Sequence, residues 1–171
     1  MYQLGDLIVY GATGVCRVEA ILSSSELGGA ADGRTYYRLA PLYQSGTVYT
    51  PADNEKVPMR PVISREEAEA LIDSISSRSP EAVCADTSQA LAQYYHGVLH
   101  RPDCGALIEL TMSIYRKRVQ AEEQNRRLGS VDERYMKQAE RLLFGELAVA
   151  LDIPCEDVPA YIARRVEQGA R

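Results

Sequence analysis

The sequence contains no tryptophan, one phenylalanine and only two histidines, and its four cysteines are widely separated. The cysteines form no Cys-x-x-Cys pair and no cluster with histidine, so the pattern favours small buried apolar residues over zinc ligands or disulfide partners. No apolar run approaches the roughly 20 residues that are needed to cross a bilayer. Met1 leads directly into an expected strand and leaves no room for a signal sequence, so we expect a cytoplasmic protein. The cysteines are Cys16, Cys84, Cys104 and Cys155.

The sequence also lacks the residue arrangements that carry catalysis. The segment Gly11–Gly14 leads into an expected strand and is not followed by Gly-Lys-Ser or Gly-Lys-Thr, so it is a turn and not a phosphate-binding loop. No nucleophile elbow, Ser-His-Asp set or carboxylate pair in an apolar setting is evident, so we expect neither an enzyme nor a cofactor. His96 and His100 have the spacing of two metal ligands on a helix, but Gly97 weakens that helix. Exposed surface histidines are the favoured alternative to a metal site.

The charge balance differs between the two halves of the chain. The whole chain has 171 residues and a net charge of −5, which argues against a generic nucleic-acid coat. Residues 1–84 carry 7 Lys and Arg against 11 Asp and Glu, whereas residues 85–171 carry 12 against 13. The acidity therefore lies mainly in the first half, and a local basic patch is possible in the second.

The stretch from Gly5 to Ile21 has the clearest strand, turn, strand pattern in the chain and predicts a β-hairpin. A polar loop over Ser23–Arg34 follows it. Further strands are expected at residues 35–42 and 46–50, where Pro51 either stops the strand or marks it as an edge, and an irregular piece at residues 56–62. Four or five short strands predict a small curled sheet or barrel of the SH3 or Tudor type.

From Ser64 onward the apolar residues repeat at helical spacing. Ser64 and Glu67 form a capping box that starts a helix ending near Ser76. Four more helices are expected. The first covers Glu81–Val98, with a break allowed near Asp86, and ends at Gly97 and the pair Arg101 and Pro102. The second is capped by Asp103, and the third begins with a Ser130–Glu133 capping box. The fourth covers about Cys155–Gln168.

The expected fold class is therefore α+β, a small β-barrel followed by an all-α domain. The expected domains are residues 1–63 and 64–171, with a linking helix at about 64–77.

Basic side chains gather in the second half of the chain, on two expected helices. Such faces could contact a phosphate backbone, and the alternative is a solvated helix surface, because glutamates are interleaved with the cations. The candidate DNA-binding residues are Arg116, Lys117, Arg118, Arg126, Arg127, Arg134, Lys137 and Arg141.

Tyrosines concentrate on the expected strands, and some of them must be core residues. Tyr49, beside Pro51, is the best candidate for an outward-facing tyrosine of the kind enriched at protein interfaces. An edge strand at residues 46–50 could also pair with a strand of a partner.

Three segments of the chain carry a recognisable combination of residues. The first segment has Gly5, Asp6, Ile8, Val9, Tyr10, Gly14, Val15, Val18 and Ile21. The second has Thr50, Pro51 and Asn54. The third has Leu128, Glu133, Ala139, Leu142, Leu143, Glu146 and Leu147. In this order they resemble the opening pattern, the Val-Pro-x-x-Asn signature and the helical close of the CarD family of bacterial transcription regulators.

The resemblance implies a Tudor-like first domain that binds the RNA polymerase β subunit and a helical second domain that contacts promoter DNA. It places the polymerase-binding edge at Thr47, Val48, Tyr49, Thr50 and Pro51. The sequence departs from the family at Gly11 and Tyr49, where the family has Pro and often Arg. It also lacks the tryptophan wedge, flanked by basic residues, that the family places at the position of residues 86–91. A protein-interaction adaptor without DNA contact is therefore the alternative hypothesis.

Overall fold

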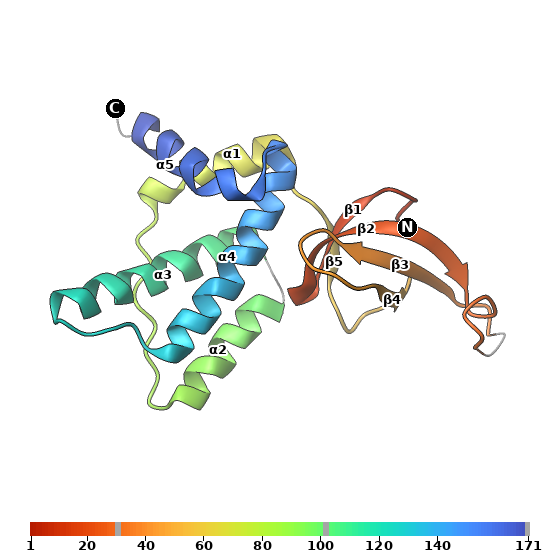
Figure 1. The fold of residues 1–171 in the computed structure, drawn as a ribbon, viewed down its shortest axis with the longest axis horizontal. Coiled ribbons are helices and arrows are strands. Elements are labelled where there is room, and N and C mark those ends of the chain that lie inside the picture. Colours follow the sequence, from red (N-terminus) through yellow and green to blue (C-terminus); the bar gives the residue numbers. More distant parts are fainter. Residues whose placement is uncertain (30–31, 101–102, 170–171) are drawn as a thin grey trace. The chain divides into compact units, whose positions relative to one another are not determined.

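Strands occupy the first third of the chain and helices occupy the rest (Figure 1). A computed structural model describes residues 1–29, 32–100 and 103–169. The chain divides into two compact units, Met1–Val62 and Ile63–Arg171. The first unit holds an antiparallel five-stranded sheet and the second holds five α-helices among the described residues. This confirms the expected α+β class. None of the described helices has the length and apolar character that a membrane span requires.

The sheet of the first unit has the strand order β4-β3-β2-β1-β5, so β4 and β5 are its edges. Its core consists of five side chains, of which Cys16 and Val18 are separated by the exposed Arg17, as expected where a strand has one buried face. These core residues are Ile8, Cys16, Val18, Tyr37 and Leu39. The strands are β1 (Leu7–Tyr10), β2 (Gly14–Ser23), β3 (Thr35–Pro41), β4 (Val48–Pro51) and β5 (Met59–Pro61). The likeness to a Tudor barrel stays a prediction.

The predicted hairpin is present, with Leu7 paired to Arg17 and Tyr10 to Gly14. Its connection is a single 3-10 turn, η1 (Gly11–Thr13), in which Gly11 has a φ of 44°. Gly14 then has a φ of 87°, a conformation that side chains with a Cβ rarely adopt. The irregular piece around residues 56–62 contains β5, which is only three residues long and pairs with β1.

Helix α4 is the centre of the helical unit (Figure 1), and helices α1, α2, α3 and α5 pack against it. Its long apolar stripe explains this position, because it supplies the largest set of buried side chains in the unit. Ala68 and Ile72 of α1 belong to the same core, so α1 is part of this unit. The helices are α1 (Arg65–Asp73), α2 (Ser88–His100), α3 (Cys104–Glu123), α4 (Ser130–Leu151) and α5 (Val158–Gly169).

Two of the predicted helix caps are confirmed. Ser64 Oγ accepts a hydrogen bond from the Glu67 amide at 3.1 Å, and the Glu67 carboxylate accepts one from the Ser64 amide at 2.8 Å. Asp103 Oδ1 accepts from the Ala106 amide at 3.0 Å at the start of α3.

The capping box expected at Ser130 and Glu133 is wrong. Gly129 is the N-cap of α4, Ser130 is the first helical residue, and no side chain caps this end. The last helix also begins later than expected, at Val158, after the 3-10 turn η3 (Cys155–Asp157).

The helix expected from Glu81 is also wrong over its first seven residues. Residues 78–87 are not helical, and α2 begins at Ser88, where Thr87 Oγ1 accepts from the Ala90 amide at 3.0 Å. Side chains of α3 explain this, because Ser113 donates to the Glu81 carbonyl at 2.8 Å and takes an oxygen that a helix would use. Helix α2 continues past Gly97 to His100, whereas the predicted ending at Arg101 and Pro102 lies outside the described residues.

Candidate functional site

Strand β4 forms an edge of the sheet and exposes Tyr49. Among the described residues it pairs only with β3, with Tyr49 opposite Arg38 and Pro51 opposite Tyr36. The side chains alternate, so that Thr50 is 1% exposed and Tyr49 is 51% exposed. Pro51 ends the strand, whereas Thr47 lies exposed just before it. The free side of β4 thus offers unpaired strand backbone beside an aromatic side chain.

A hollow of about 720 Å³ lies beside β4 in the first unit. Asn54 organises its loop: its Nδ2 donates to Thr50 Oγ1 at 2.9 Å and its Oδ1 accepts from the Lys56 amide at 2.8 Å. Tyr49 and Pro51 form one wall of the hollow. Asp53, Glu55 and Lys56 carry charge at its rim. The resemblance pointed to Asn54, but only the structure assigns it this supporting role.

The eight basic candidates lie on α3, on α4 and on the connection between these helices. Six of them are exposed, and Lys117 and Arg118 are half-buried. Arg116 donates to the Pro80 carbonyl at 3.1 Å and Arg134 lies 4.9 Å above the Tyr135 ring, so these two side chains already make contacts within the unit. The exposed candidates are Arg116, Arg126, Arg127, Arg134, Lys137 and Arg141.

Lys117 belongs to a buried polar network that the sequence did not predict. Its ammonium donates to Asp132 Oδ1 at 2.9 Å and to the Val83 carbonyl at 3.0 Å. The two charged side chains are only 15% and 8% exposed. The Tyr95 hydroxyl donates to the same Asp132 oxygen at 2.5 Å, and burial, together with this hydrogen bond, raises the pKa of Tyr95. The network therefore joins α2, α3 and α4, and the Lys117 ammonium is already paired within it.

A second buried carboxylate lies at the start of the helical unit. Glu146 is 2% exposed, its Oε2 accepts from the Ile63 amide at 3.1 Å, and its Oε1 accepts from the Cys104 thiol at 2.9 Å. The contact ties the first residue of the unit to α3 and α4. The resemblance included Glu146, but its apolar neighbours gave no sign of these partners.

The cysteines and histidines divide between interior and surface. Cys16 and Cys104 are buried as expected, whereas the expectation of burial is wrong for Cys84, which is exposed on the non-helical segment before α2. His96 and His100 are exposed and stacked, with ring centroids 3.6 Å apart. Within residues 1–29, 32–100 and 103–169, no cluster of three or more metal-ligating side chains occurs.

Residues 2–63 match the family model of the CarD-like/TRCF RID domain. The match covers the sheet, including β4, and ends at Ile63, before the first helix. No curated protein matches the chain. The family match supports an RNA polymerase-interacting, transcription-related protein. Residues 2–63 are therefore similar to a CarD-like/TRCF RID domain.

Proposed function

We propose that the protein is a bacterial transcription regulator that binds the β subunit of RNA polymerase through the β4 edge. The match of residues 2–63 to the CarD-like/TRCF RID domain carries this proposal. The free edge of β4 fits addition of a partner strand, and the exposed Tyr49 ring fits an aromatic anchor beside it. The contact residues are Thr47, Val48, Tyr49, Thr50 and Pro51.

The proposal divides the work between residues 1–63, which bind polymerase, and residues 64–171, which bind promoter DNA. Exposed cations of α3, α4 and their connection would contact the phosphates, with Lys117 left out because Asp132 already pairs with it. Neither role needs catalysis, in keeping with the type of domain that residues 2–63 match.

Binding to the isolated β-subunit lobe tests the polymerase contact. We expect Tyr49→Asp to weaken binding of the full chain to the immobilised lobe at least about tenfold, because it removes the anchor and adds charge to the edge. Tyr43→Asp is the control, since Tyr43 is also an exposed tyrosine of the first unit but lies outside β4. Equal binding by wild type and Tyr49→Asp would contradict β4 as the contact edge. No binding by wild type would contradict the β subunit as the partner.

An adaptor that binds polymerase without touching DNA is the second candidate. The absence of tryptophan, the net charge of −5 and the internal contacts of Lys117 and Arg116 favour it. A gel shift on a forked promoter, with and without polymerase, separates the two functions. A shift of DNA by the protein alone supports the regulator that contacts DNA, whereas a further shift of the polymerase–DNA band with no shift by the protein alone supports the adaptor.

A further inference from the structure

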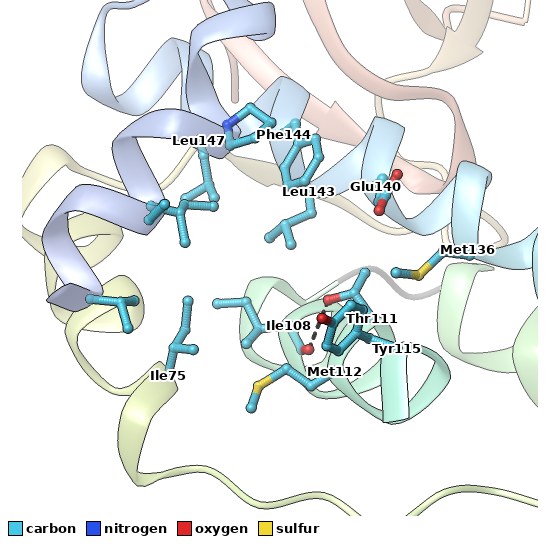
Figure 2. A pocket seen from close by; sticks show the side chains of 14 residues that line it. Ile75, Ile108, Thr111, Met112, Tyr115, Met136, Glu140, Leu143, Phe144 and Leu147 are labelled. Atoms are coloured by element: carbon cyan, nitrogen blue, oxygen red, sulfur yellow. Dashed lines mark hydrogen bonds between the residues drawn. The ribbon is translucent and has the colours of Figure 1, made fainter. Parts of the chain in front are cut away.

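The helical unit contains an apolar groove that neither the polymerase contact nor the basic residues use. Its volume is about 690 Å³, and residues of α3, α4 and α5 line it. Figure 2 shows Leu143 and Phe144 of α4 across the cavity from Ile108 and Met112 of α3. The groove is therefore bounded by helices rather than by loops.

The floor of the groove follows one face of α4. Met136, Leu143, Phe144 and Leu147 lie at the spacing of a helical stripe, and Glu140 occupies the position between Met136 and Phe144 in that stripe. Glu140 is the only charged residue among the described residues of the lining. Among the residues that the structure describes, no hydrogen bond or ion pair is made by its half-buried carboxylate. An apolar wall with one unpaired negative charge favours an occupant that is apolar and carries one positive charge.

The rim of the groove leaves apolar surface open to solvent. Tyr115 of α3 is 58% exposed, and Pro159 and Ala163 of α5 are exposed as well. Met112 and Met136 add flexible, polarisable side chains of the kind that adapt to a partner surface. These features are typical of a surface that a partner covers.

We propose that this groove binds an amphipathic helix of a partner protein, with a Lys or Arg of that helix against Glu140. Met136 and Leu147 are eleven residues apart, so the floor runs for about 16 Å, or about three helical turns. A groove of that length between α3 and α5 matches the docking of a helix through anchors three, four and seven residues apart. The inference stands independently of the polymerase contact.

Three synthetic helical peptides of about 14 residues test the groove. They share a leucine stripe and differ at its centre, which carries Lys, norleucine or Glu. A tryptophan on the outer face of each peptide reports binding by fluorescence anisotropy, because the protein contains none. We expect the full chain to bind the Lys peptide at least about tenfold more tightly than the Glu peptide, with the norleucine peptide between them.

Matched variants locate the binding. We expect Glu140→Lys to reverse the order of the peptides, whereas Glu122→Gln, at an exposed position of α3 outside the groove, leaves the order unchanged. Ala163→Phe fills the groove and should weaken binding of the Lys peptide at least about tenfold. Ala160→Phe, which also lies exposed on α5 but outside the lining, should leave it unchanged. Circular dichroism establishes that each variant is folded.

Several results would overturn the proposal. One such result is that the Lys peptide does not bind, or that Glu140→Lys leaves the order of the three peptide affinities unchanged. Another is binding of decylamine at this site in the absence of peptide binding, which would assign the groove to a small amphiphile. A third is a dimer that Ala163→Phe converts to a monomer and that the Lys peptide does not dissociate, which would assign it to a second copy of the chain.

Discussion

The charge of Lys117 has a structural use within the helical unit. Its ammonium and the Tyr95 hydroxyl share one oxygen of Asp132, so removal of Lys117 leaves a buried carboxylate without its counter-charge. We expect Lys117→Met to lower the free energy of unfolding by about 3 kcal/mol in urea denaturation. Lys137→Met, at an exposed position of α4, should change it by less than about 0.5 kcal/mol. Equal effects of the two substitutions would show that the pair contributes nothing.

The cysteines should differ in reactivity because they differ in burial. Burial raises the pKa of the Cys16 thiol to about 11, from an ordinary value of 9.0, whereas Cys84 is exposed. The folded protein therefore holds the Cys16 proton more tightly than the unfolded chain does. The stability that this provides is complete below pH 9 and is lost as the pH rises toward 11. At pH 9 we expect iodoacetamide to modify Cys84 in the native protein and Cys16 only after denaturation, as followed by peptide mass spectrometry. Equal rates of iodoacetamide modification of Cys84 and Cys16 in the native protein would contradict the burial of Cys16.

At the scale of single elements, local signals predicted those helix and strand ends that local chemistry determines. Ser64 and Asp103 cap their helices as expected, and the first hairpin pairs within the stretch whose strand, turn, strand pattern predicted it. The non-helical segment before α2 was missed because its carbonyl groups bind side chains of α3, about 30 residues later in the chain. No pattern near Glu81 reveals that contact. The ion pair of Lys117 was missed for the same reason, because its partner Asp132 lies on another helix.

The two expected capping boxes give a direct comparison between elements. Ser64 accepts a hydrogen bond at the start of α1, whereas Ser130 is a first-turn residue of α4 and caps nothing. We expect Ser64→Ala to lower the free energy of unfolding by about 1 kcal/mol and Ser130→Ala to change it by only a few tenths. Guanidinium denaturation of both variants measures the difference. A larger loss for Ser130→Ala would mean that α4 begins one residue later than described.

At the scale of the whole molecule, the sequence predicted the change from sheet to helices and the edge that carries Tyr49. The resemblance also predicted the family whose model residues 2–63 match. The apolar groove between α3 and α5 was not predicted, because a stripe such as Met136 to Leu147 has the same pattern whether another helix covers it or leaves it open. The contact between Glu146 and the Ile63 amide likewise depends on chain packing over a long separation.

The salt dependence of promoter binding tests the role of the basic helices in the whole molecule. We expect the Lys137→Glu, Arg141→Glu double variant to reduce the slope of log affinity against log salt concentration by about 2, because each phosphate contact contributes about 1. Arg164→Glu, on the exposed side of α5, is the control and should leave the slope unchanged. An unchanged slope in the double variant means that these residues make no phosphate contact. No DNA binding by wild type would favour the adaptor.

Amide hydrogen exchange of the full chain, with and without the β-subunit lobe, tests the proposed polymerase contact most directly. Strand addition at β4 would bury and pair its free backbone groups, so we predict slower exchange in residues 47–50 on binding. The opposite edge of the sheet, β5, should exchange as in the free protein. Protection of β5, or of the helical unit alone, with unchanged exchange in β4 would contradict the account.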